Sequence, residues 1–295
     1  MHGLVFLTLC WILSPKADGS CTLPPLWTGD WYDSFYGQLT FPGTSKLAGW
    51  QVTSFASVIT SWTCVSEDTT NNYLLFLGDQ TVDFFGMPQN VFRCVKWIKI
   101  TNNSFFYYAR SDIEVNANNA RVKVEAVDSA VTSWSTASYC NPTSAPGPEE
   151  YHMLIKKGSE SLAKQWCPVP LLGTFNYVHN DGTTESCASD SQMTACPSWT
   201  TIQFDYTKCS KTQAFSQEGS VYCVNTITEG DNYYTALYNP GVVNTVYQRF
   251  TCYVISETSS GFYVSDSPGI CEAGQTSTVN ATDGSGVLTL NRTRK

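Results

Sequence analysis

Four cysteines recur in the same order in the two halves of this 295-residue chain. Around Cys94 the sequence reads as an apolar strand, a polar turn and an aromatic return strand, and the sequence around Cys252 reads in the same way. The corresponding pairs are Cys21 with Cys167, Cys64 with Cys223, Cys94 with Cys252, and Cys140 with Cys271. This shared order predicts two divergent copies of one cysteine-stapled β unit.

The cysteines also indicate a compartment. Cys10 lies in the apolar run of residues 4–13, which is too short to span a membrane and has the length of a signal-peptide core. We therefore expect a signal peptide and a secreted, extracellular product. The other cysteines are spread through turn-rich segments, which is typical of an oxidised framework. The expected disulfide cysteines are Cys21, Cys64, Cys94, Cys140, Cys167, Cys187, Cys196, Cys209, Cys223, Cys252 and Cys271.

That set is odd in number, so one thiol stays free or forms an intermolecular disulfide. Pairing cannot be read from a sequence. As hypotheses, neighbouring strands would be joined by Cys64–Cys94 and Cys223–Cys252, with a local bridge from Cys187 to Cys196 or Cys209. Each bridge should stabilise the fold by on the order of 2–4 kcal/mol. A zinc site is disfavoured, because the chain has no C-x-x-C pair and few histidines.

The composition favours strands over helices, since 14% of residues are aromatic and only 14% are charged. The expected fold class is all-β, with two tandem disulfide-stapled antiparallel barrels or sandwiches joined by a Pro-rich linker. A short helix is expected within residues 149–165, interrupted at Gly158. The expected organisation is a signal peptide (1–19), a first β domain (20–140), a linker (141–166), a second β domain (167–272) and a flexible tail (273–295).

The net charge of −8, with a pI near 4.8, argues against a nucleic-acid partner, because neutralising phosphates needs a basic surface. It leaves extracellular protein, glycan or mineral matrix as partners. No stretch after the first residues approaches the length of a membrane-spanning helix, so no membrane span is expected. Three N-x-[ST] triplets predict glycosylation at Asn102, Asn280 and Asn291.

Catalytic, metal and cofactor motifs are not expected. A Ser-His-Asp triad would need His152 or His179, and neither has a nucleophile motif around it. Paired carboxylates for glycoside cleavage remain a weaker alternative. The acids that could meet in space are Asp33, Asp79, Asp83, Asp112 and Glu114. We therefore expect a protein that is not an enzyme and carries no cofactor, and interpret these acids as solvated strand ends.

Aromatic residues gather in the first half of the chain. They could line a cavity for a small apolar ligand, but core packing is the interpretation that we favour. The residues concerned are Trp27, Trp31, Trp50, Trp62, Trp97, Phe105, Phe106 and Tyr107. The stretch from Trp27 to Tyr32 resembles the Gly-x-Trp start of the lipocalin barrel, which supports a carrier as the alternative function.

A second resemblance covers most of the chain. Cys167-Pro-Val-Pro-Leu-Leu-Gly-Thr-Phe, Phe204-Asp-Tyr-Thr-Lys-Cys and Arg249-Phe-Thr-Cys-Tyr-Val are similar to a domain of unknown function in secreted and cell-surface proteins of invertebrates. Cys21 to Trp31 is similar to the domain that precedes it there. The resemblance implies a disulfide-bonded extracellular β protein and no catalytic residue. The function expected is surface binding by a glycosylated, non-enzymatic protein of the extracellular space, such as a cuticle, mucus or mineralised shell matrix.

Overall fold

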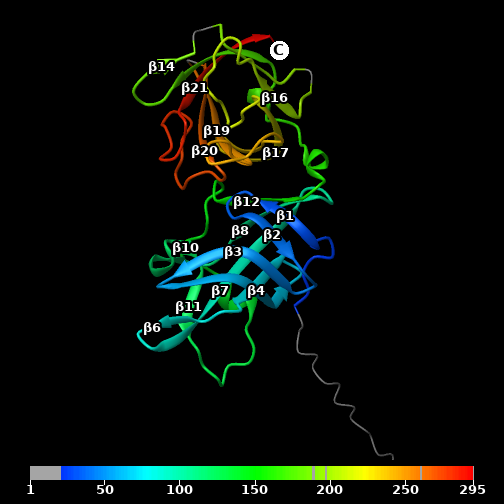
Figure 1. The fold of residues 1–295 in the computed structure, drawn as a ribbon, viewed down its shortest axis with the longest axis vertical. Helices are drawn as coiled ribbons and strands as arrows, with labels where there is room; N and C mark the ends of the chain where they lie inside the picture. The colour runs from blue at the N-terminus through cyan, green and yellow to red at the C-terminus, as the bar shows by residue number, and fades with distance from the viewer. Residues whose placement is uncertain (1–20, 188–189, 197, 260, 295) are drawn as a thin grey trace, which may run out of the picture.

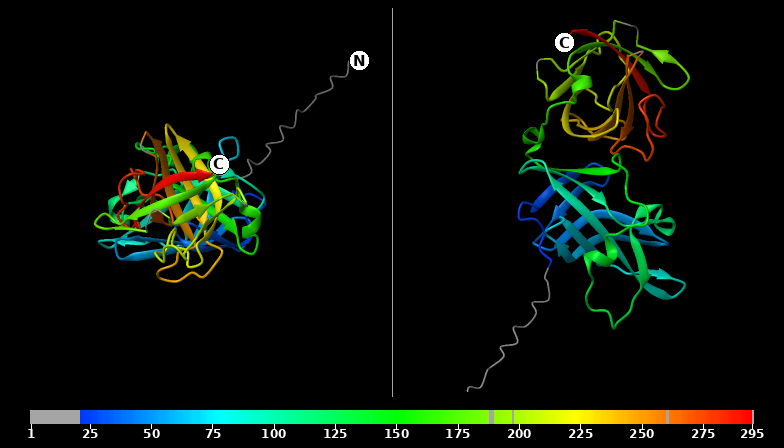
Figure 2. Two further views of the ribbon diagram at one scale, coloured as in Figure 1. Left: turned by 90° about the horizontal axis from the view of Figure 1, so that it is seen from above. Right: turned by 180° about the vertical axis from the view of Figure 1, so that it is seen from behind.

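The computed structural model describes residues 21–187, 190–196, 198–259 and 261–294. Two antiparallel barrels of eight strands each are stacked along the long axis of the molecule (Figures 1 and 2). The expected all-β fold with two tandem barrels is therefore confirmed. The expected signal peptide, residues 1–19, lies outside the described residues. Within those residues, no helix has the length and apolar character needed to cross a membrane.

The first barrel is a meander in which each strand pairs with the next and the last returns to the first. Its strands are β1 (Gly29–Asp33), β2 (Gly37–Phe41), β3 (Lys46–Ser54), β4 (Ser57–Asp68), β5 (Tyr73–Gly78), β7 (Met87–Lys99), β8 (Ser104–Ala109) and β12 (Tyr151–Lys156). Additional elements decorate it: β6 (Val82–Phe84), β9 (Ile113–Glu114), η1 (Val115–Ala117), β10 (Ala120–Arg121), β11 (Lys123–Ala126) and α1 (Thr136–Tyr139).

The second barrel repeats this circular order. Its strands are β13 (Thr174–Asn180), β15 (Gln192–Thr194), β16 (Thr201–Phe204), β17 (Ser220–Glu229), β18 (Asn232–Tyr238), β19 (Phe250–Thr258), β20 (Gly261–Pro268) and β21 (Val287–Arg294). It also has β14 (Glu185–Ser186), η2 (Glu160–Ala163) and η3 (Val169–Leu171). Trp31 on β1 and Phe175 on β13 are both fully buried, and each follows a glycine with a positive φ. The two copies thus start their barrels in the same way.

Side chains fill both barrels. Trp27, Trp31, Trp50 and Trp62 are at most 1% exposed and pack together in the first core. The second core is built around smaller rings, including Phe175, Tyr177 and Tyr253. The interpretation of the first group of aromatics as core packing is confirmed for most members; Phe106 instead joins a cluster between the barrels. Among the described residues, these buried side chains occupy the interior of each barrel.

The expected linker is in part a barrel strand. β12 pairs with β1 on one side and β8 on the other, and so closes the first barrel. Leu154 faces the first core, whereas Tyr151, Met153 and Ile155 pack against β17, β18 and β19 of the second barrel. A strand buried on both faces lacks polar alternation, which explains why the sequence suggested a helix. Only a short 3₁₀ helix, η2, forms after Ser159.

The expected flexible tail is also wrong in part. β21 pairs with β13 and β20 and closes the second barrel. Leu288 and Leu290 alternate with polar residues along it and point into the second core. The alternation was present in the sequence, but a preceding stretch rich in Gly, Ser and Thr obscured it.

Five disulfides connect the described cysteines: Cys21–Cys64, Cys94–Cys140, Cys167–Cys223, Cys187–Cys209 and Cys252–Cys271. The hypotheses Cys64–Cys94 and Cys223–Cys252 are wrong, because in each pair one cysteine joins a barrel core and the other lies on the barrel's outer face. Of the two local options, Cys187–Cys209 is the one formed. Cys196 was expected among the bridged cysteines, but it is unpaired and exposed.

The bridges support the duplication. Cys21–Cys64 and Cys167–Cys223 tie the segment before each barrel to its fourth strand. Cys94–Cys140 and Cys252–Cys271 tie the sixth barrel strand to a segment that follows. Cys94 and Cys252 therefore occupy equivalent surroundings.

Candidate functional site

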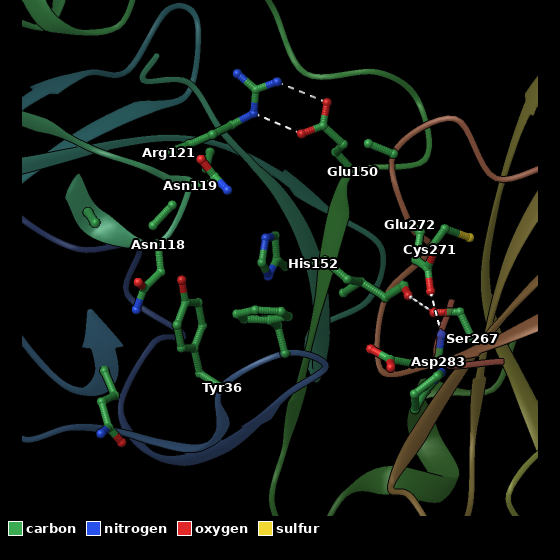
Figure 3. Close-up of a pocket in the computed structure, with 18 of the residues that line it drawn as sticks. Tyr36, Asn118, Asn119, Arg121, Glu150, His152, Ser267, Cys271, Glu272 and Asp283 are labelled. Carbon is green, nitrogen blue, oxygen red and sulfur yellow. Dashed lines mark hydrogen bonds and ion pairs between the residues drawn. The ribbon is translucent and has the colours of Figure 1, made fainter. Parts of the chain in front are cut away.

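A cleft of about 540 Å³ lies where one end of the first barrel meets the segment 267–273 of the second (Figure 3). The first barrel contributes the turn after β1, strands β3, β7 and β12, and the η1–β10 turn. The side chains used below are Phe35, Tyr36, Arg93, Asn118, Asn119, Arg121, Glu150, His152, Glu272 and Asp283. The volume is within the range of small-molecule sites.

Asp33 forms the buried base of this site. It ends β1, and its Oδ1 accepts hydrogen bonds from the backbone N–H groups of Phe35 (2.8 Å) and Tyr36 (2.9 Å), which shapes the turn. Its Oδ2 accepts a hydrogen bond of 2.6 Å from the Tyr107 hydroxyl. Burial raises the pKa of Asp33, but His152, Tyr107 and the Tyr36 backbone outweigh it, so the pKa lies below its ordinary value. Asp33 is therefore a buried carboxylate.

Arg93 supplies the opposite charge. It is 2% exposed, and its guanidinium lies 4.7 Å from the ring centroids of both Tyr36 and Trp50. One of its Nη groups donates to the Tyr36 hydroxyl. Burial lowers the pKa of Arg93, but Tyr36, Tyr107 and Asp33 together raise it above its ordinary value. Its Nε has no hydrogen-bond partner among the described residues.

His152 lies between two tyrosine rings. Its ring is parallel to those of Tyr107 and Tyr36, with centroids 4.8 Å and 5.9 Å away. Its Nδ1 is 3.8 Å from Oδ1 of Asp33, too far for a hydrogen bond, and no described residue satisfies it. Burial lowers the pKa of His152 despite the attraction of Asp33. The ring is therefore neutral at pH 7.

An ion pair forms one wall of the cleft. Arg121 donates from Nε and Nη2 to the two carboxylate oxygens of Glu150, at 2.8 Å and 2.9 Å (Figure 3). Burial raises the pKa of Glu150, but hydrogen bonds from Arg121 and the Gly147 backbone lower it below its ordinary value. Glu150 is thus an acceptor of hydrogen bonds and not a proton donor.

The second barrel provides the opposite wall. The carboxylate of Glu272 accepts backbone hydrogen bonds of 3.0 Å from Thr282 and from Asp283. Burial raises the pKa of Glu272, but these bonds outweigh it and lower the pKa below its ordinary value. Both glutamates of the cleft are therefore ionised, whereas glycoside cleavage needs one carboxylic acid with a raised pKa.

Most of the other candidate residues from the sequence make contacts with near neighbours, away from the cleft. His179 lies inside the second barrel, with Nδ1 3.3 Å from the Ser186 hydroxyl. Of the five candidate acids, only Asp33 lies beneath the cleft. The remaining four have separate contacts: Asp79 with Lys46, Asp83 with the Gly86 N–H, Asp112 with Thr143, and Glu114 as the cap of η1. Over the described part of the chain, no cluster of His, Cys, Asp and Glu is arranged to hold a metal ion.

The glycosylation candidates differ in their surroundings. Asn102 is exposed in the β7–β8 turn, and Asn291 is exposed on β21. The side-chain amide of Asn280 instead donates to the Asp181 carbonyl at 3.4 Å, and its oxygen is buried. A glycan at Asn280 would require this amide to leave its contact. Modification of all three stays a prediction.

Sequence reasoning missed Arg93, Arg121 and Glu150. A signal existed for Arg93, because a lone arginine in the apolar run Val-Phe-Arg-Cys-Val of β7 must be buried or must interrupt the strand. Nothing local indicated the pair of Arg121 and Glu150, which only the return of β12 brings together.

Comparison with known families concerns the second barrel. Residues 163–286 match a family described as "Domain of unknown function (DUF7042)". The match begins in η2 and stops just before β21, the strand that closes the barrel. The match agrees with the expected resemblance to a domain of unknown function. The description of that family names no activity. No curated protein and no solved structure matches the chain.

Proposed function

We propose that this chain is a secreted, non-enzymatic binding protein of the extracellular space, and that the cleft between its barrels is the binding site. The observation that carries the proposal is the group of Asp33, Arg93 and His152 beneath that cleft. Burying charged groups is unfavourable unless they are well paired. Here two of the buried nitrogens, Arg93 Nε and His152 Nδ1, have no partner among the described residues. Both atoms lie beneath the surface of the cleft, so a ligand whose binding moves the covering side chains would complete their hydrogen bonds.

Several features support the remaining parts of the proposal. Five disulfides are typical of proteins that fold in an oxidising compartment. A carrier that holds an apolar ligand inside a barrel is disfavoured, because side chains fill both interiors. A hydrolase is disfavoured because both cleft glutamates have a lowered pKa. An acidic binding protein suits an extracellular matrix of protein, glycan or mineral, and glycosylation at Asn102 and Asn291 is compatible with that setting.

The test uses the full chain secreted from eukaryotic cells and applied to chitin beads, mucin-coated beads and calcium carbonate. Ala273 lines the cleft and is exposed, so Ala273→Trp should fill the cleft without disturbing a core. Ala130→Trp, at an exposed position that does not line the cleft, is the matched control. We expect wild type and Ala130→Trp to be retained on at least one material and Ala273→Trp to be lost. Equal retention of both variants, no retention of wild type, or a chain that stays inside the cell would contradict the proposal.

A further inference from the structure

We infer that the ligand of the cleft is a neutral oligosaccharide, held by hydrogen bonds to its hydroxyl groups and by contact of a sugar ring with Phe35. This inference rests on the proposed function, since it names the chemical class that the same site takes. It follows from three properties of the cleft: an exposed aromatic ring, hydrogen-bonding groups of both kinds, and a surplus of negative charge.

The aromatic ring is that of Phe35, which is 59% exposed although it is large and apolar. It follows Asp33 in the turn after β1 and is held by edge contacts with Tyr36 at 4.8 Å and His152 at 5.6 Å between ring centroids. One face of a sugar ring is lined by C–H groups, so it can cover an aromatic ring while its hydroxyls point to the sides. An exposed ring fixed by two other rings is suited to that contact.

Polar groups of both kinds line the same cleft as Phe35. The amides of Asn118 and Asn119 both donate and accept, and two successive left-handed conformations, with φ of 53° and 60°, place them in one tight turn at the rim. Glu272 can only accept, so the amides of Asn118 and Asn119 are the groups here that can donate. A hydroxyl is both donor and acceptor, so a molecule with many hydroxyls can pair with each of these groups. A hydrocarbon ligand would leave them unpaired, which is unfavourable.

The charges distinguish a neutral ligand from an anionic one. Arg121 is already paired with Glu150, and Arg93 is faced by the buried Asp33. Glu272 and Asp283 then remain on the opposite wall without a salt bridge to a described residue. A sulfated or carboxylated glycan would be repelled by these groups. The charges therefore argue against an anionic sugar, and an uncharged sugar is the class of glycan that fits.

The test measures binding to the secreted full chain by isothermal titration calorimetry and saturation-transfer NMR. Two neutral probes represent two sources of such a ligand: an N-acetylglucosamine oligomer for a matrix polysaccharide and an oligomannose glycan for a glycoprotein. A heparin oligosaccharide is the anionic probe and spermine the cationic one. We expect at least one neutral probe to bind and to transfer saturation from aromatic protons, and we expect neither charged probe to bind more tightly.

Phe35→Ala should weaken binding of the neutral probe by about 3- to 10-fold, as expected for the loss of one aromatic contact. Phe35→Tyr should restore it. Phe85→Ala removes another exposed ring that does not line the cleft, and should leave binding unchanged. Ala273→Trp should abolish binding.

The outcomes separate this inference from the proposed function. If Ala273→Trp loses retention on a matrix material but no neutral probe binds, the inference fails and the proposed function stands. If Ala273→Trp is retained as well as wild type, the proposed function fails. Preferred binding of heparin or spermine overturns the inference. So does a neutral probe that binds equally to wild type, Phe35→Ala and Ala273→Trp, because it must then bind elsewhere.

Discussion

Each barrel has eight strands in the same circular order, and the two have equivalent bridges. They differ at the positions that form the cleft. Asp33, two residues after Trp31, corresponds to Tyr177, two residues after Phe175. Arg93, next to Cys94, corresponds to Thr251, next to Cys252. The Thr251 hydroxyl donates to the Ala214 carbonyl at 2.9 Å and carries no charge. The second barrel therefore closes without these buried charges, so closure of this kind of barrel does not require them.

The largest effect is expected from Asp33→Asn. Asparagine can still accept the turn hydrogen bonds, but it removes a buried negative charge that helps to stabilise the charged form of Arg93. We expect the free energy of unfolding of the first barrel to fall by about 3 kcal/mol. Tyr177→Phe in the second barrel is the matched change and should alter stability by less than about 1 kcal/mol. Guanidinium unfolding, followed by tryptophan fluorescence and circular dichroism, checks both. If both substitutions lowered the free energy of unfolding by similar amounts, the charged group would contribute no more to the first barrel than Tyr177 contributes to the second.

An effect of similar size is expected from the equivalent bridges. Cys94 and Cys140 are 46 residues apart in sequence, and Cys252 and Cys271 are 19 apart. Replacing either pair by alanines should lower the free energy of unfolding by about 2–4 kcal/mol. Because the longer loop loses more entropy when closed, the first pair should contribute about 0.8 kcal/mol more. Denaturant unfolding of the two double variants gives the difference, and the opposite order would argue that native-state geometry dominates.

Acidification should change the stability of the two barrels differently, and this effect should be smaller. The pKa of His152 is lowered by burial. Below about pH 6.5 the unfolded chain therefore binds a proton at this residue that the folded barrel does not bind, and the free energy of unfolding falls. The pKa of Asp266 in the second barrel is raised by burial, so the folded state takes up this proton first, and the contribution of Asp266 to stability rises as the pH falls towards 3.8.

Unfolding measured between pH 7 and pH 4 would test this difference. His152→Gln should flatten the decline of the first barrel, and Asp266→Asn should remove the gain of the second. An unchanged slope in His152→Gln would refute the assignment to that ring.

The smallest effect concerns the β6–β7 hairpin of the first barrel. Phe85, in the β6–β7 turn, is 90% exposed and has a φ of 53°, a conformation unfavourable for a bulky side chain. At the β17–β18 turn of the second barrel, a similar φ of 56° is occupied by Gly230. Phe85→Asn creates the Asn-Gly sequence preferred in such turns and should stabilise the first barrel by about 1 kcal/mol. A loss of stability in thermal unfolding would mean that the contact with Phe84 outweighs the backbone strain.

The fold class could be predicted because strand periodicity and the order of cysteines are local signals. The bridges could not, because pairing depends on which face of a barrel a cysteine occupies. Cys64 and Cys94 lie on strands separated only by β5, but their side chains belong to different clusters inside and outside the barrel. The proximity of two strands was therefore not enough to predict which cysteines form a disulfide.

The cleft was missed for a related reason. Asp33 and His152 were each identified, but as unrelated candidates, because the residues between them gave no hint that β12 returns beside β1. Asp33 was interpreted as a solvated strand end, whereas burial beside Arg93 and Tyr107 gives it a different role. Only the closure of the barrel brings these residues to one place.

The position of β12 also limits how the molecule can be divided. A fragment that ended at Cys140 would lack this strand and leave β1 and β8 with unpaired backbone groups along their free edges. Such edges are templates for intermolecular pairing, so the fragment should aggregate. The second barrel alone would expose the apolar surface that Tyr151, Met153 and Ile155 cover. In evolutionary terms, loss of either copy would damage the one that remains.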